Sequence, residues 1–157
     1  MSAAVASGMV PMAVGTETDG SITCPAAING IVGFKPTVGL IPRTHIVPIS
    51  ASQDTAGPMT ATVREAAELL TVIAGSDPAD PATKEADRRK TDYAVRLDPN
   101  ALRGKGIGVM RFASGFGTDA PFELALAVLR EQGATLVEIK HFDEGEMGRI
   151  EYQVLLT

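Results

Sequence analysis

The sequence has 157 residues, of which 45% are hydrophobic and 21% are charged, with a formal net charge of -5 and a pI near 5.0. This length and composition suit a globular domain with a sizeable core. The negative charge and the low aromatic content of 4% argue against nucleic acid as a partner, because nucleic-acid-binding proteins usually carry basic surfaces and stacking aromatics. No stretch has the length of apolar sequence that crosses a membrane, and no signal peptide is visible, so we expect a cytoplasmic protein without a membrane partner.

The first third of the chain combines apolar runs with a polar turn. Residues 2–8 are rich in alanine and predict a short helix that ends at a glycine. Residues 9–14 predict a buried strand, and the polar residues 15–20 predict a sharp turn around the favoured dipeptide Asp19-Gly20. Residues 35–50 contain three prolines, which predicts extended, irregular chain because proline fixes φ and removes a hydrogen-bond donor.

The next segment predicts one regular helix followed by irregular chain. Thr62 and Glu65 have the spacing of a capping box, and apolar residues repeat at helical spacing after them, so residues 62–74 predict a helix with an apolar stripe in the core. Residues 76–98 combine prolines with a mixed-charge run, which predicts a solvated loop or linker.

The last third predicts a βαβ unit. Residues 107–112 predict a strand, residues 119–132 a helix, and residues 135–140 a second strand, parallel to the first through a right-handed crossover. The apolar face of this helix is predicted from Phe122, Ala125, Leu126 and Leu129. Residues 144–157 predict a final helix, and the whole pattern indicates an α/β fold.

Ser21 follows the polar turn directly and is the candidate catalytic residue. In this position its hydroxyl lies beside several free backbone N–H groups, and acyl transfer needs a nucleophile together with donors directed at the oxygen that becomes negative. The same pattern also occurs in ordinary turns. Cys24 is the one cysteine, and a catalytic cysteine needs a nearby histidine; we therefore expect it to be a small buried apolar residue.

Three sequence segments resemble the amidase signature family and raise the significance of this turn. They are Ala13-Val14-Gly15-Thr16-Glu17-Thr18-Asp19-Gly20-Ser21-Ile22 with Pro25-Ala26, then Gly30-Ile31-Val32-Gly33-Phe34-Lys35-Pro36-Thr37, and Gln53-Asp54-Thr55-Ala56-Gly57-Pro58-Met59. The form Glu-Thr-Asp-Gly-Ser is similar to free-standing amidases and peptide amidases. The family's tRNA-amidating members usually have Gly in place of Asp19 and Arg in place of Thr23.

The resemblance implies a mixed sheet flanked by helices and a serine hydrolase without cofactor or metal. In it, Ser21 is the nucleophile, and the backbone N–H groups of Thr18, Asp19, Gly20 and Ser21 form the oxyanion hole. The implied reaction is hydrolysis of a carboxamide C–N bond in a small molecule or peptide through an acyl-enzyme on Ser21. Lys35 does not match the family's catalytic lysine, and we expect it to be structural or exposed.

The family's catalytic lysine and bridging serine would both precede Met1. We therefore expect residues 1–157 to be a partial amidase-signature domain, with the signature core in 1–75, a linker in 76–98 and the βαβ portion in 99–157. A serine hydroxyl without a base is a weak nucleophile, so we expect this chain alone to be inactive. Exposed sheet edges at the two ends favour a homo-oligomer.

Two other interpretations stay open. The chain could be a non-catalytic remnant that binds amides or a protein partner. The run from Gly115 to Ala120 follows a predicted strand and opens a predicted helix, as a dinucleotide-binding turn does, with Glu138 or Asp143 as the ribose-binding acid; short glycine patterns are weak evidence. His45, Gln53 and Asp54 are expected either near the pocket or in loop hydrogen bonds.

Overall fold

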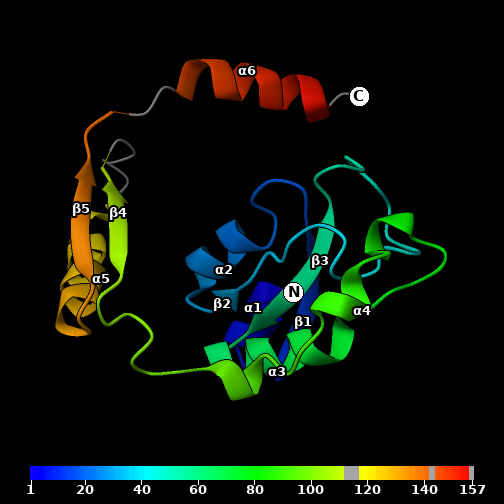
Figure 1. Ribbon diagram of the computed structural model, residues 1–157, viewed down its shortest axis with the longest axis horizontal. Helices are drawn as coiled ribbons and strands as arrows, with labels where there is room; N and C mark the ends of the chain where they lie inside the picture. Colours follow the sequence, from blue (N-terminus) through cyan, green and yellow to red (C-terminus); the bar gives the residue numbers. More distant parts are fainter. Residues whose placement is uncertain (112–116, 142–143, 156–157) are drawn as a thin grey trace. The chain divides into compact units, whose positions relative to one another are not determined.

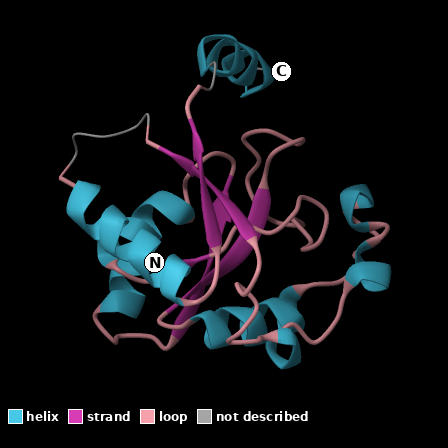
Figure 2. Ribbon diagram, turned by 60° about the vertical axis from the view of Figure 1, so that its left-hand side comes forward, coloured by secondary structure: helices cyan, strands magenta, loops and turns pink. Residues whose placement is uncertain are grey.

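The computed structural model describes residues 1–111, 117–141 and 144–155, and it contains both helices and strands (Figures 1 and 2). The chain divides into two compact units, of which the first comprises Met1–Arg96 with Tyr152–Thr157 and the second Leu97–Glu151. The mixed α/β class predicted from the sequence is confirmed.

The first unit is built on a three-stranded antiparallel sheet. Strand β3, Thr55–Thr60, lies between β1, Met12–Glu17, and β2, Val32–Gly33. All six residues of β3 are buried. The register of β1 against β3 runs from Met12 opposite Thr60 to Glu17 opposite Thr55, so the end of β1 meets the start of β3.

Three helices flank this sheet. They are α1, Ser2–Ala6, α2, Thr23–Asn29, and α3, Val63–Ile73. Two small hydrophobic clusters join helices, strands and loops: the first is Val5, Ala13, Ile22, Ala26 and Met59, and the second is Ile41, Ala56 and Leu70. Ile22 therefore anchors the chain just after the polar turn in the core of this unit.

The first strand differs from the one predicted. It begins at Met12 rather than Met9 and continues to Glu17, so half of the expected turn belongs to the strand. Met12 and Val14 are exposed, because only one face of β1 is covered. The sequence did not predict β3 or α2, since β3 contains the pair Gly57-Pro58 and α2 lacks a long apolar repeat.

The chain from Ser76 onwards differs from the solvated loop expected there. It forms the 3-10 helices η1, Pro81–Thr83, and η2, Ala94–Arg96, with the short helix α4, Ala86–Arg89, between them. Asp80, Thr83 and Ala86 are buried. Part of this segment, including the charged residue Asp80, thus takes part in the packing of the first unit.

The capping box of α3 is confirmed and supports a stability prediction. The Thr62 hydroxyl accepts the Glu65 N–H at 3.2 Å, and the Glu65 carboxylate accepts the Thr62 N–H at 2.9 Å. We expect Thr62→Ala to lower the free energy of unfolding by about 1 kcal/mol, as N-cap losses do. Urea unfolding followed by circular dichroism measures this, with the exposed turn residue Thr37→Ala as the control; equal losses in both variants would contradict the capping role.

The second unit contains the predicted βαβ arrangement. Strand β4, Gly106–Met110, pairs in parallel with β5, Thr135–Ile139, and α5, Asp119–Glu131, lies between them in sequence. Leu126 is the buried residue of α5, whereas Phe122, expected on its apolar face, is 39% exposed. Helix α6, Glu144–Leu155, matches the predicted final helix. No described helix is long and apolar enough to span a membrane.

Candidate active site

Ser21 lies in the tight turn that joins β1 to α2. Gly20, before it, has a φ of 82°, a conformation that residues with a side chain rarely adopt. Ile22, after it, is fully buried in the first hydrophobic cluster. The exposed serine is therefore held between a glycine that turns the backbone and a residue anchored in the core.

Glu17 fixes the far side of this turn. Its Oε2 accepts the backbone N–H groups of Ile22 at 2.7 Å and Thr23 at 2.8 Å. These two N–H groups lie at the start of α2, where the helix itself provides no acceptor for them. Burial raises the pKa of the Glu17 carboxyl, but hydrogen bonds from the N–H groups of Thr23, Ile22 and Gly20 lower it, and the net pKa is below its ordinary value. Glu17 is therefore an ionised structural anchor of the turn.

Thr18 is held through both its side chain and its backbone. Its hydroxyl donates to Asp54 Oδ1 at 2.5 Å, and both residues are 7% exposed. Its carbonyl oxygen accepts from Lys35 Nζ at 2.5 Å. The expectation that Lys35 has a structural role is met by this contact, which fixes the peptide group before Asp19.

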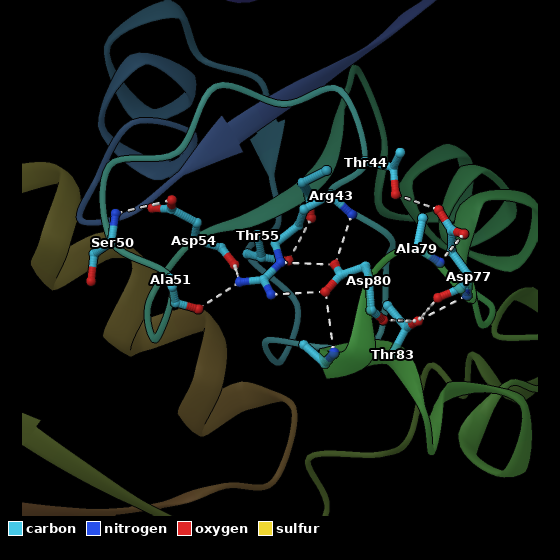
Figure 3. Close-up of polar contacts among 12 residues, drawn as sticks. Arg43, Thr44, Ser50, Ala51, Asp54, Thr55, Asp77, Ala79, Asp80 and Thr83 are labelled. Carbon is cyan, nitrogen blue, oxygen red and sulfur yellow. Dashed lines mark hydrogen bonds and ion pairs between the residues drawn. The ribbon is translucent and has the colours of Figure 1, made fainter.

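Asp54 connects this turn to the loop before β3. Its Oδ2 accepts the backbone N–H groups of Ile49 at 2.8 Å and Ser50 at 3.0 Å; the bond to Ser50 is drawn in Figure 3. Burial raises the pKa of Asp54, whereas the Thr18 hydroxyl, these two N–H groups and the charge of Arg43 lower it, and the net pKa is below its ordinary value. Both roles left open for Asp54 apply, because it makes loop hydrogen bonds and also lines the pocket beside Ser21.

Three backbone N–H groups of the turn have no acceptor among the described residues. Within the described chain, the N–H groups of Thr18, Asp19 and Ser21 donate no hydrogen bond, whereas the Gly20 N–H interacts with the Glu17 carboxylate. Unpaired N–H groups stabilise the oxyanion of a tetrahedral intermediate where they are directed at that oxygen.

A small pocket of about 40 Å³ opens beside Ser21. Its lining residues are Thr16, Glu17, Thr18, Ser21, Ile46, Val47, Ile49 and Asp54. Of the residues that the structure describes, no lysine or histidine lines this pocket, so the lining supplies no obvious base for the serine. The sequence did not predict the apolar side chains at 46, 47 and 49 in this lining, although residues 46–49 form an apolar run between His45 and Ser50.

The other loop candidates lie outside this lining. His45 is exposed and has a φ of 69°, a left-handed conformation that is uncommon for a residue other than glycine. Gln53 has a buried Oε1 without a hydrogen-bond partner in the described structure.

A partly buried ion pair holds the loop that carries Asp54. Arg43 donates from Nε to Asp80 Oδ2 at 2.9 Å and from Nη2 to Asp80 Oδ1 at 3.0 Å, and its Nη1 donates to the carbonyl oxygen of Ala51 at 2.6 Å (Figure 3). The side-chain hydrogen bond from Arg43 is the main cause of the low pKa of Asp80, which is about 2. A cavity of about 240 Å³ adjoins this pair and shares Ile46 and Asp54 with the pocket beside Ser21.

The prediction for Cys24 was wrong. Its side chain is exposed, because it lies on the first turn of α2 rather than in the core. Its Sγ lies close to Gly20, where a Cβ added by substitution would be 2.9 Å from the sulfur. The described residues contain no cluster of three or more histidine, cysteine or acidic side chains that could hold a metal ion.

The glycine run that suggested a dinucleotide site is only partly described. Gly115 and Phe116 lie outside the described residues, as does Asp143. Glu138 forms an ion pair with Arg111, Oε1 to Nε at 2.8 Å, which engages the carboxylate considered for a ribose. Dinucleotide binding therefore stays a prediction without support from the described contacts.

Comparison with known proteins gives consistent matches. A family model described as Amidase matches residues 1–156. A glutamyl-tRNA(Gln) amidotransferase component of Chloroflexus aggregans is 45% identical over 141 residues, which are 87% of this chain and 28% of that protein. The X-ray structure of the peptide amidase from Stenotrophomonas maltophilia matches with a TM-score of 0.91 and 50% identity, over 99% of this chain and 32% of that chain.

A more distant structure shows the same similarity. The corresponding amidotransferase component of Thermotoga maritima matches with a TM-score of 0.80 and 30% identity, over 98% of this chain and 39% of that chain. This chain spans about a quarter of the length of the curated relatives that it matches, with 24% and 28% in two of them.

Proposed function

Because this chain belongs to the amidase signature family, we propose that it carries the nucleophile of an amide hydrolase, with Ser21 as the attacking residue. The observation that supports this most directly is the geometry of the turn. Ser21 is exposed in the same turn as the N–H groups of Thr18 and Asp19, which donate no hydrogen bond within the described chain, and the turn is fixed by Glu17 and Asp54. These donors belong to the proposed oxyanion hole, whereas the N–H of Gly20, the third donor that the family resemblance implies, interacts with the Glu17 carboxylate.

The proposed reaction proceeds in two steps. Ser21 Oγ forms a bond to the carbonyl carbon of a carboxamide and gives its proton to a base, while the N–H groups stabilise the negative oxygen. The C–N bond then breaks, and the base returns the proton to the nitrogen, which leaves as ammonia or an amine. Water then adds to the acyl carbon. The bond between this carbon and Oγ breaks, Oγ takes a proton from the water, and the carboxylic acid is released.

The base is the part of this mechanism that the pocket lacks. The two carboxyl groups in its lining, Glu17 and Asp54, both have lowered pKa values and already accept backbone N–H groups, which makes them poor bases. We propose that the base belongs to a longer form of the protein, as the family resemblance implies, and that this chain alone turns over amides very slowly. The peptide amidase relative supports a peptide or small carboxamide as the substrate.

Chemical rescue of the missing base tests this proposal. The chain is incubated with a fluorophosphonate, with and without a primary alkylamine as a substitute base, and adduct formation is followed by intact mass. We expect one adduct per chain, formed slowly and accelerated at least tenfold by the amine, because the amine removes the Ser21 proton in place of a lysine.

Two variants make this measurement specific. Ser21→Ala should form no adduct under either condition, whereas Ser7→Ala, which removes an exposed serine at the end of α1, should react like the unchanged chain. An adduct that persists in Ser21→Ala contradicts the assignment of the nucleophile. The absence of any adduct, even with the amine, contradicts the preformed oxyanion hole and favours a non-catalytic remnant.

A further inference from the structure

The loop beside Ser21 exposes large apolar side chains. Val47 is 87% exposed and Ile49 is 69% exposed, with the exposed Pro48 between them. Such a contiguous apolar run on a surface suggests a binding role, whereas single exposed apolar residues do not. The segment 46–49 is called the apolar loop below.

The apolar loop belongs to the pocket that contains the nucleophile. Ile46, Val47 and Ile49 line the same small pocket as Ser21 and the oxyanion-hole residue Thr18. A group bound against this loop therefore lies next to the atom that attacks. The volume of about 40 Å³ is small, and it suits the narrow cross-section of an alkyl chain rather than a ring system.

The backbone of the apolar loop is held at both ends. The N–H of Ile46 donates to the Arg43 carbonyl oxygen at 2.9 Å, and the Ile46 side chain packs against the cluster of Ile41, Ala56 and Leu70. At the other end, Asp54 accepts the N–H groups of Ile49 and Ser50, of which the bond to Ser50 is drawn in Figure 3. A surface that is fixed in advance binds a ligand with a smaller loss of conformational entropy than a mobile one.

The charges of the lining disfavour an anionic ligand. Among the described residues that line the pocket, two are carboxylates, Glu17 and Asp54, and none is cationic. An anionic substrate group would be repelled here, since like charges interact unfavourably at short range. An apolar group gains from contact with Val47 and Ile49.

We propose that the apolar loop binds the acyl side chain of the substrate and selects uncharged aliphatic acyl groups over small or anionic ones. This inference rests on the proposed role of Ser21, because it places the acyl carbon at that residue. It assigns Val47 and Ile49 as specificity-determining residues of the proposed reaction.

Binding of three amides to the folded chain tests this inference without turnover. Acetamide, hexanamide and the monoamide of adipic acid are titrated into the ¹⁵N-labelled chain, and N–H shifts are followed by NMR. We expect hexanamide to bind at least about tenfold more tightly than acetamide, because four further methylene groups are partly buried. The adipic monoamide, of similar length but anionic, should bind no more tightly than acetamide, and the largest shifts should occur at Val47 and Ile49.

Matched variants locate the effect. Val47→Ser and Ile49→Ser should each remove most of the preference for hexanamide. Val72→Ser, at an equally apolar and exposed position of α3 outside the pocket lining, should keep it. Because amide binding is measured without turnover, amide preference reports on the loop and the fluorophosphonate reaction reports on the nucleophile.

Several outcomes would overturn the inference. Equal affinities for hexanamide and acetamide, or no hexanamide binding to a chain whose spectrum shows it to be folded, exclude an acyl-binding loop even if Ser21 reacts with the fluorophosphonate. Self-association that Val47→Ser removes, together with unchanged amide binding, would identify the loop as a contact between copies of the chain instead.

Discussion

Gly57→Ala is expected to lower the free energy of unfolding of the first unit by about 3 kcal/mol, at the upper end of the range for overpacked interiors. Gly57 lies in the middle of the buried strand β3, where an added Cβ would be 2.2 Å from the carbonyl oxygen of Phe34 and 2.9 Å from Pro36 Cδ. The nearest obstacle is backbone, which cannot rotate away as a side-chain end can. Urea unfolding monitored by circular dichroism measures the loss.

A second glycine in a strand provides the control. At Gly106, the first residue of β4, a Cβ would meet no atom within 4 Å, so Gly106→Ala should change the free energy of unfolding by less than about 0.5 kcal/mol. If Gly57→Ala behaved like this control, the close packing of β3 against the chain around Phe34 would be wrong.

Asp80→Asn is expected to lower the free energy of unfolding by about 3 kcal/mol at pH 7, because it leaves the Arg43 guanidinium inside the unit beside a neutral amide. Asp80 is 7% exposed and receives two hydrogen bonds from this guanidinium, and a third from the Arg43 N–H at 3.0 Å. Glu68→Gln, an exposed carboxylate on α3, is the control for loss of one negative charge and should change the stability by less than about 0.5 kcal/mol.

The same ion pair predicts an acid-dependent loss of stability. The folded pKa of Asp80 is about 2, below the ordinary value of 3.8, so its contribution is full above about pH 4 and is lost as the pH falls towards 2. The difference in stability between the unchanged chain and Asp80→Asn should therefore shrink by about 2 kcal/mol over this range. A difference that stays constant from pH 7 to pH 2 would contradict the assigned pKa and its cause.

The elements that the sequence predicted well carry local signals. Helix α3 begins with the reciprocal contact of Thr62 and Glu65, residues only three apart. The same holds in the second unit. Neighbouring residues predict its two short strands and the helix that ends before Gly133. These signals act over one or two turns of chain, which is the range that a sequence pattern describes.

The elements that the sequence did not predict depend on distant partners. Strand β3 contains Pro58, which usually argues against a central strand, yet its carbonyl oxygen accepts the N–H of Phe34 and its neighbours pair with β1. The site shows the same limit. The position of Ser21 was predicted from the residues of its own turn. The contacts of Thr18 with Lys35 and with Asp54 join residues 17 and 36 positions apart, and no local pattern indicates them.

The register of β1 against β3 has a consequence for the order in which the site forms during synthesis. Glu17 pairs with Thr55, and the hydrogen bond between Thr18 and Asp54 continues that pairing by one position. Asp54 is translated 36 residues after Thr18, a delay on the order of seconds at ordinary rates of elongation. The serine turn is therefore synthesised before its anchor, and the contact that fixes Thr18 forms only once Asp54 has been added and β3 has paired with β1.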